Sequence, residues 1–165
     1  MRTAKIGKKN DRTDSFVVLH NIRSCYNVGS IFRTSDALGV EKIFLCGYTP
    51  NPDKNSSINK TALGAQDMIS WEAHWQTHHI LKKLKRDGIT IIALELSKDS
   101  IALEDFEPNF PFCLLLGNEV TGLSAAILKY ADYVVQIPML GGKESMNVSV
   151  SYGIGMYTIK NKIKC

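Results

Sequence analysis

Glycines and polar side chains that could take part in chemistry follow three predicted strands of this sequence, at the point where each strand ends. The three exits are Glu95–Ser97 after Leu94, Gly117–Leu123 after Leu116, and Pro138–Asn147 after Ile137. Ligands of open parallel sheets bind beyond the carboxyl ends of the strands, and glycine allows a backbone to approach a ligand closely. Three such exits in one chain therefore favour a shared ligand site over three unrelated turns.

A fourth segment follows the first predicted strand and carries an asparagine and an arginine at helical positions. Asn27 and Arg33 are six residues apart, so a single helix can hold both, with Asn27 as its N-cap. Gly29, in the first turn, would let another backbone come close. Arg33 is either a surface charge or a bidentate binder of an anion, and its residue type alone leaves both interpretations open.

The elements that must position these segments alternate along the chain. Apolar runs predict strands at 16–19, 42–46, 68–71, 89–94, 111–116 and 133–137, and helical spacing predicts helices at 27–38, 61–66, 79–87, 123–130 and 147–163. A polar loop with one extended piece is expected at 97–109. The alternation predicts an α/β fold with a mostly parallel sheet flanked by helices, and the length predicts a single domain over 1–165.

Three motifs, in the order in which they occur, resemble those of the SpoU (TrmH-like) RNA 2′-O-ribose methyltransferases, a family of the SPOUT class. The first is Asn27-x-Gly29-x-x-x-Arg33, and the second is Leu116-Gly117-Asn118-Glu119-x-x-Gly122-Leu123. The third is Ile137-Pro138-Met139 followed by Ser145-Met146-Asn147-Val148-Ser149. The resemblance extends over about residues 16–160, which is nearly the whole chain.

The resemblance implies a SPOUT-type fold with a C-terminal trefoil knot, S-adenosyl-L-methionine as the cofactor, and a homodimer that forms through the C-terminal helix. No periodicity could indicate the knot, since true knots are essentially absent from folds. By the resemblance, the cofactor-binding residues are Leu94, Gly117, Ile137, Ser145 and Met146. Arg33 matches the catalytic arginine of the motif, with Asn27, Glu119, Ser145 and Asn147 in support.

Glycines inside the predicted C-terminal helix agree with a packed interface. Gly153 and Gly155 each cost a helix up to about 1 kcal/mol relative to alanine, so close packing is the expected compensation. By the resemblance, that packing lies at the dimer interface.

The activity implied by the resemblance is methyl transfer to a ribose 2′-OH in structured RNA, in tRNA rather than rRNA. Such a transfer needs a positioned oxygen and stabilisation of the negative charge that develops on it. Arg33 suits that role better than proton abstraction, because arginine stays protonated. The alternative is a non-catalytic RNA-binding or assembly protein with a decayed methyltransferase fold, although the polar residues of all three motifs remain. Base methylation by another SPOUT branch fits Asn27 and Arg33 poorly.

The charge of the chain is concentrated at its two ends. Residues 1–12 carry a net charge of +4 and residues 158–165 a net charge of +3, whereas residues 13–157 carry −3. Basic ends suit contact with a polyanion such as RNA, and they equally suit solubility alone. With only a short basic tail at 1–15 and no separate RNA-binding domain, we expect the catalytic unit and its tails to recognise the RNA.

Several other functions are disfavoured. Apolar runs are too short to span a bilayer and no export signal is found, so we expect a cytoplasmic protein without a membrane partner. The four cysteines lack CxxC spacing, which indicates reduced thiols. His74 and His78 stand at i,i+4, but no acidic or cysteine ligand follows at suitable spacing, so no metal is expected. Trp71 and Trp75 could either pack in the core or stack on bases.

Overall fold

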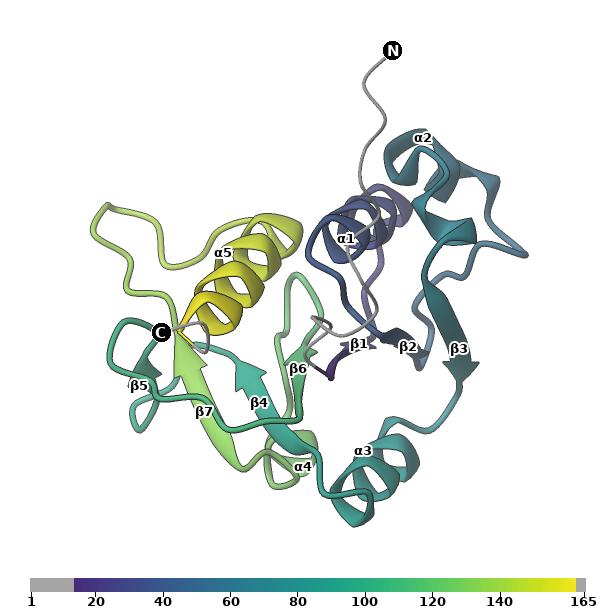
Figure 1. Cartoon of the computed structure of the whole chain (residues 1–165). Helices are drawn as coiled ribbons and strands as arrows, with labels where there is room; N and C mark the ends of the chain where they lie inside the picture. Colours follow the sequence, from purple (N-terminus) through teal and green to yellow (C-terminus); the bar gives the residue numbers. More distant parts are fainter. Residues whose placement is uncertain (1–13, 163–165) are drawn as a thin grey trace.

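A seven-stranded sheet forms the centre of the molecule (Figure 1). The computed structural model describes residues 14–162, so the first 13 residues of the predicted basic tail at 1–15 and the last three residues of the chain lie outside the described part. The strands are β1 (Ser15–His20), β2 (Lys42–Cys46), β3 (Ser70–His74), β4 (Thr90–Leu94), β5 (Ile101–Ala102), β6 (Phe112–Leu116) and β7 (Tyr133–Gln136). Their order is β3-β2-β1-β6-β4-β7-β5, and each pair of neighbours is parallel, which confirms the predicted sheet.

Helices cover both faces of this sheet (Figure 1). One face carries α1 (Cys25–Ala37), α2 (Asn59–Ala62) and α5 (Val148–Asn161), together with the 3-10 turns η1 (Ser56–Ile58) and η2 (Ala65–Asp67); the other carries α3 (Thr77–Arg86) and α4 (Ala125–Leu128). Buried strand residues divide between the two faces, as when Val17 packs with α1 and α5 while Val18 packs with α3. Within residues 14–162, no helix is long and apolar enough to cross a membrane.

The start of α1 differs from the prediction. Ser24 is the N-cap, because its Oγ accepts a hydrogen bond from Asn27 N at 3.3 Å, and the helix begins at Cys25. The predicted cap, Asn27, therefore lies inside the first turn, where its side chain is available for contacts with other segments. The helix and its extent are otherwise as expected.

The position of β3 also differs from the prediction of a strand at 68–71. Its register with β2 pairs Lys42 with Ser70 and Cys46 with His74, which moves the strand towards the C-terminus. His74 consequently lies on β3 while His78 lies on α3, so the two histidines do not share a helix. The pattern of alternation could not reveal this, because β3 is an edge strand and part of its surface is exposed.

Gly29 allows α2 to approach α1 closely, as its position in the motif predicts. A Cβ atom built on Gly29 would overlap Thr61 Oγ1 and the carbonyl oxygen of Ile58, and would lie 2.9 Å from Ala62 N. Thr61 Oγ1 in turn donates a hydrogen bond to the carbonyl of Tyr26 at 2.9 Å. The glycine thus fixes the second helix against the helix that begins at the ligand edge.

α5 runs beside α1 in the same direction. The two helices start together, where Asn147 bonds to Asn27, and Lys160 near the end of α5 bonds to the carbonyl of Gly39 just after α1. Between these points, the buried Tyr152 hydroxyl and Ser35 Oγ, in the last turn of α1, form a hydrogen bond of 2.6 Å. The two helix glycines pack against other parts of this chain, since a Cβ on Gly155 would lie 3.1 Å from Leu94 Cδ2 and one on Gly153 would lie 3.8 Å from Thr34 Cγ2 of α1. Both helices therefore begin at the carboxyl edge of the sheet.

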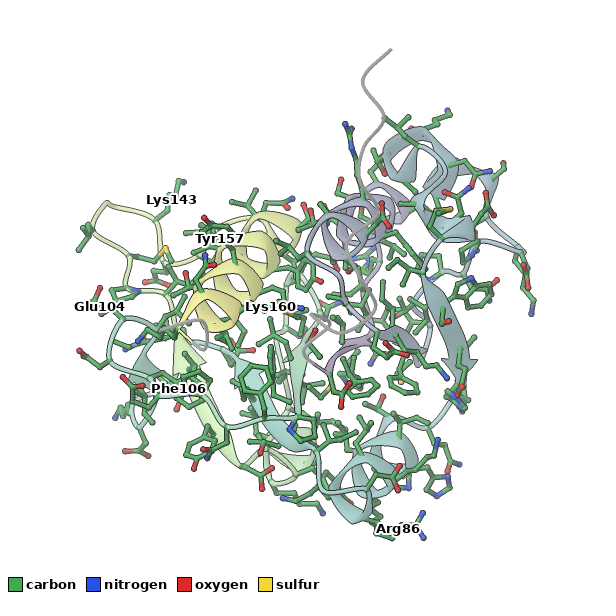
Figure 2. All side chains as sticks on the ribbon, in the orientation of Figure 1. Arg86, Glu104, Phe106, Lys143, Tyr157 and Lys160 are labelled. Atoms are coloured by element: carbon green, nitrogen blue, oxygen red, sulfur yellow. The ribbon has the colours of Figure 1, made fainter. Side chains whose placement is uncertain are left out.

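Two lysines of the basic C-terminal segment bond to the protein itself. Lys160 Nζ donates to Ser15 Oγ at 2.9 Å and to the carbonyl of Gly39 at 3.3 Å (Figure 2). Lys162 Nζ donates to the carbonyl of Phe106 at 2.9 Å, which fastens the end of α5 to the segment that follows β5. An RNA contact through Lys160 or Lys162 would have to share its ammonium group with these bonds.

Replacing Gly29 with Ala should destabilise the protein, because the added methyl group overlaps backbone and side-chain atoms of the α2 region. We expect a loss of about 1–3 kcal/mol in the free energy of unfolding, measured by chemical denaturation. The neighbouring substitution Ser30→Ala adds no atoms and should stay within about 0.5 kcal/mol of the wild type. Equal stability of the two variants would contradict the close approach.

Candidate active site

A cavity of about 690 Å³ lies where β4, β6 and β7 end. All three predicted strand exits contribute to its wall, and so does the start of α1. Its lining includes every predicted cofactor-binding residue: Leu94, Gly117, Ile137, Ser145 and Met146. It also includes four of the five predicted catalytic residues, Asn27, Glu119, Ser145 and Asn147. The prediction that these segments share one ligand edge is therefore consistent with the geometry.

The Glu119 carboxylate holds the loop between β1 and α1 against the exit of β6. One oxygen accepts from Arg23 N at 2.9 Å, and the other accepts from Ser24 N and from Asn27 Nδ2, both at 3.1 Å. Burial alone would raise the pKa of Glu119, but these N–H donors outweigh it and hold the pKa below its usual value. Glu119 is thus an anion whose acceptor sites are occupied by the protein.

Asn27 connects this carboxylate to the third motif. Its Oδ1 accepts a hydrogen bond from Asn147 Nδ2 at 3.0 Å, while its own Nδ2 donates to Glu119. Asn147 is also the N-cap of α5, with Oδ1 accepting from Ser149 N at 2.9 Å. A continuous line of hydrogen bonds therefore links the starts of α1 and α5 through one side of the cavity.

The exit of β6 is a tight turn that glycines make possible. A Cβ on Gly117 would lie 2.6 Å from the carbonyl carbon of Gly122, and Gly122 itself has φ +64°. Inside the turn, Asn118 Oδ1 accepts from Val120 N at 2.8 Å and from Thr121 N at 2.9 Å. The turn thereby presents backbone groups of the second motif to the cavity.

Glu95 ties the exit of β4 to this turn, a role that the sequence did not predict. Its carboxylate accepts from Leu123 N at 2.8 Å and from Leu96 N at 3.1 Å. The residue directly follows Leu94, one of the predicted cofactor contacts, and both line the cavity. Its position directly after a buried strand was the available signal, but its acceptor role depends on a turn that comes 28 residues later.

The exit of β7 is an open loop. Gly141 and Gly142 have no neighbouring atoms within 4 Å of a built Cβ, and Leu140 is 98% exposed. Lys143 also extends from this loop, away from the sheet (Figure 2). Ser145 and Asn147 return the chain to the cavity before α5 starts.

Arg33 is the one predicted catalytic residue outside the cavity wall. Each residue turns a helix by about 100°, so side chains six apart on α1 point about 120° away from each other. Arg33 accordingly lines a smaller hollow with Asp36, Leu63 and Met68, whereas Asn27 faces the main cavity. The spacing placed both residues on one helix, as predicted, but not on one site of the protomer.

Arg23, and not Arg33, is the arginine that lines the cavity. It is exposed on the cavity rim, and its backbone N–H is held by Glu119. The sequence segment that follows β1 contains Arg23, but no periodicity distinguishes it from a solvated loop residue. Its fixed backbone places a cation beside the opening.

The sequence profile of the SpoU rRNA Methylase family matches residues 14–157, and the sites described above occupy the same range. The chain belongs to this family.

Known SpoU relatives cover most of the chain. It is 32% identical to the tRNA (guanosine(18)-2′-O)-methyltransferase of Borreliella burgdorferi over 89% of its length, and 32% identical to the Thermus thermophilus enzyme of the same name over 87%. It spans 66% and 73% of these two relatives, respectively.

Solved structures of SpoU proteins have the same fold. The structure of an AdoMet-bound rRNA methyltransferase from Sinorhizobium meliloti superimposes with a TM-score of 0.83 at 26% identity, covering 90% of this chain and 56% of that one. The A. aeolicus TrmH/SpoU tRNA modifying enzyme superimposes with a TM-score of 0.82 at 30% identity, covering 92% and 76%. The SPOUT-type fold is thus established, whereas the trefoil knot stays a prediction.

His20 and His74 of this SpoU chain bond to neighbouring side chains. His74 Nε2 lies 2.9 Å from Glu72, whose other oxygen accepts from Lys42 at 2.8 Å; these two partners lower the pKa of Glu72 to about 2. His20 Nδ1 lies 2.7 Å from Thr77 Oγ1, and burial lowers the pKa of His20. Among residues 14–162, no group of three or more His, Cys, Asp or Glu side chains is placed to hold a metal ion.

Replacing Glu119 with Gln should loosen the β1–α1 loop, because the amide turns an N–H group towards the N–H donors of Arg23 and Ser24. We expect a loss of about 1–3 kcal/mol in the free energy of unfolding at neutral pH, measured by chemical denaturation. Folding lowers the pKa of Glu119, so the wild-type advantage is complete above the unfolded pKa of about 4.3. It is lost as the pH falls through the lower folded value.

The substitution Glu144→Gln is the matched control, since Glu144 is an exposed carboxylate of the same cavity. It should change the unfolding free energy by no more than about 0.5 kcal/mol. A Glu119→Gln difference that grows on acidification would show that the carboxylate does not hold the loop as an anion.

Proposed function

We propose that this protein transfers a methyl group from S-adenosyl-L-methionine to a ribose 2′-OH of RNA, in tRNA rather than rRNA. The observation that carries the proposal is the single cavity at the ends of β4, β6 and β7, joined to α1 and α5 by Asn27, Glu119 and Asn147. The Borreliella and Thermus relatives, which act on tRNA by name, support the choice of substrate.

The cavity suits an adenosyl cofactor in size and in the chemistry of its wall. Its volume lies within the usual range for small-molecule sites. Leu94, Ile137 and Met146 offer apolar surface for a flat base, and the strand ends at Leu94, Gly117 and Ile137 offer backbone groups for its polar edge. Ser145 adds a hydroxyl beside them. When bound, S-adenosyl-L-methionine supplies the methyl group as an electrophile.

The role of the chain is to hold the 2′-oxygen in line with that group and to stabilise its developing charge. Arg33 is suited to this because its guanidinium donates several hydrogen bonds and keeps its proton. Asn27, Ser145 and Asn147 would position the ribose, and Glu119 would act by holding Asn27 and the loop of Arg23. The decayed-fold alternative would require a cavity that no longer binds the cofactor.

A homodimer through α5 would explain how Arg33 can act in catalysis although it lies outside the cavity of its own chain. Val150, Ile154 and Tyr157 form an exposed apolar stripe at i, i+4 and i+7 along α5, with Tyr157 60% exposed (Figure 2). Arg33 is exposed on α1, the helix beside α5. Pairing of two such faces would cover the stripe and bring Arg33 of one protomer towards the cavity of the other.

A cytoplasmic location is part of the same proposal. Cys46 and Cys113 are buried free thiols, and burial raises the pKa of Cys46 to about 12. Such thiols are inert and are typical of proteins from a reducing compartment. Cys165 lies outside the described residues.

Replacing Arg33 with Ala should abolish methyl transfer while cofactor affinity, measured by calorimetry, stays within a few-fold of the wild type. The reason is that Arg33 contacts the substrate oxygen or its phosphate but no part of the cofactor site. Transfer is measured with methyl-labelled cofactor and small RNA from cells that lack the gene. Arg86→Ala removes an arginine at the end of α3, on the other face of the sheet, and should leave both properties unchanged (Figure 2).

The same assay separates the alternatives. A single 2′-deoxy substitution at the mapped target should block methylation if the ribose is the acceptor, since only the 2′-OH is removed. Absence of any binding heat with S-adenosyl-L-methionine would favour the decayed fold, and near-full turnover by Arg33→Ala would refute the role of that residue.

Replacing Ile154 with Glu should convert a dimer into a monomer, because it places a charge in the middle of the apolar stripe. Sedimentation should then give half the wild-type mass, with methyl transfer lost and cofactor binding retained. Ile101→Glu is the matched control, because Ile101 is 38% exposed on β5 and Ile154 is 39% exposed on α5. An unchanged mass for Ile154→Glu would exclude α5 as the interface.

A further inference from the structure

Tyr48 is an exposed aromatic residue beside the cavity that none of the motifs includes. It follows β2 by two residues, and 53% of its surface is accessible. Covering the exposed apolar surface of such a ring is favourable, because it removes that surface from water. Hydrogen bonds to Tyr48 and to the residue after it nevertheless fix the position of the ring.

The backbone on both sides of Tyr48 is anchored. Thr49 is buried, and its Oγ1 donates to the carbonyls of Cys46 and Leu19 and accepts from Ile22 N at 3.0 Å. On the other side, Gly47 has φ +66°, and a Cβ there would overlap Asn21 Oδ1. Tyr48 N donates to that same Oδ1 at 3.3 Å. Four hydrogen bonds and a required glycine thus set the direction in which the side chain leaves the turn.

The hydroxyl group of Tyr48 is held at the cavity wall. Asn118 Nδ2 donates to it at 3.0 Å and to the carbonyl of Asn21 at 2.8 Å. Asn118 directly follows Gly117 at the end of β6 and lines the cavity. Because β1 lies between β2 and β6, the ring must cross the carboxyl end of β1 and point towards the cavity.

Asn21, over which the ring passes, has a left-handed backbone with φ 57°. This conformation is uncommon outside glycine, although asparagine tolerates it better than most residues. It is retained here because Asn21 accepts from Tyr48 and Asn118 at once. Uncommon conformations held in this way cluster at sites that need a fixed geometry.

We propose that the exposed face of Tyr48 is a stacking platform for an unpaired base of the RNA substrate, adjacent to the methylated nucleotide; this rests on the proposed function. Unpaired bases are commonly recognised by stacking on aromatic side chains, each worth about 1–3 kcal/mol. A ring that is already held at both ends loses little conformational freedom on binding. The substrate class is therefore a loop or single-stranded segment rather than a regular duplex.

Arg23 supports a nucleic acid as the occupant. It follows Ile22, whose N–H donates to Thr49, the residue after Tyr48, so the segment that carries this exposed cation is bonded to the turn that carries the ring. Guanidinium groups bind phosphate oxygens in a bidentate manner. An aromatic face and an exposed arginine on two segments that are bonded to each other match the alternation of base and phosphate along one strand.

Stacking is tested by three substitutions that separate aromaticity from bulk. Tyr48→Phe keeps the ring and loses only the bond to Asn118, Tyr48→Leu keeps apolar bulk, and Tyr48→Ala removes both. The probe is a short single-stranded RNA with a central 2-aminopurine, whose fluorescence is quenched on stacking, and the same RNA in a duplex serves as the comparison. We expect Ala and Leu to weaken binding of the single strand by about tenfold and to abolish the quenching, and Phe to retain most of both.

The matched control is Trp75→Ala, since Trp75 is also an exposed aromatic residue, follows β3 at the far edge of the same sheet and makes no bond to the cavity wall among the described residues. It should leave the quenching intact. In the methylation assay, Tyr48→Ala should raise KM for RNA about tenfold while leaving the affinity for S-adenosyl-L-methionine unchanged.

Each outcome decides one point. Three results would overturn the stacking proposal. They are an affinity of Tyr48→Leu for single-stranded RNA equal to that of Tyr48→Phe, an affinity of Tyr48→Ala within twofold of the wild type, and equal wild-type affinity for single strand and duplex. A loss of cofactor affinity in Tyr48→Ala with RNA binding intact would reassign the ring to the cofactor. Tyr48-dependent quenching without methylation of any RNA by the wild type would refute the proposed function but not the stacking. Melting temperatures of Tyr48→Phe and Tyr48→Leu equal to that of the wild type would exclude unfolding as the cause of a lost affinity.

Discussion

The carboxylate of Glu119 carries the constraint on which the arrangement of the cavity depends. It reaches from the exit of β6 to a loop that lies about 95 residues earlier, and there it accepts from two backbone N–H groups and from Asn27. These donors keep the pKa of Glu119 low and occupy its acceptor sites. A carboxylate so fully engaged has no free site for a substrate proton, so its contribution is to hold other groups in place.

Two hydrogen-bond networks start from neighbouring residues of the same turn. Glu119 extends through Asn27 to Asn147 and so connects the starts of the two long helices on one face of the sheet. Asn118 extends to Asn21 and Tyr48, along the ends of the strands. The cavity lies beside their common origin. A disturbance of the Gly117–Gly122 turn would therefore displace the α1 and α5 side of the cavity and the Tyr48 side together, because both networks begin in this turn.

Much of this organisation follows from local sequence, and the remainder depends on distant contacts. The strands were predictable because buried parallel strands are continuously apolar, and the shared ligand edge because parallel strands end on the same side. The cap of α1 was misassigned because Ser24 and Asn27 are both good caps and only the hydrogen bond to Glu119 distinguishes them. The position of the Tyr48 ring could not be predicted, because its orientation depends on Asn118, which comes 70 residues later.

The first motif shows why residues of one motif need not serve one cavity. Asn27 and Arg33 are carried by the same helix, yet a separation of six residues directs them about 120° apart. One side of α1 therefore presents Asn27 to the cavity, and another side presents Arg33 to the smaller hollow that Leu63 and Met68 also line. In a symmetric pair, such a helix would offer Asn27 to its own cavity and Arg33 to the opposite one. Under the proposed dimer, the motif would describe two halves of a site rather than a single cluster, and a protomer alone would hold its cofactor without completing the catalytic group.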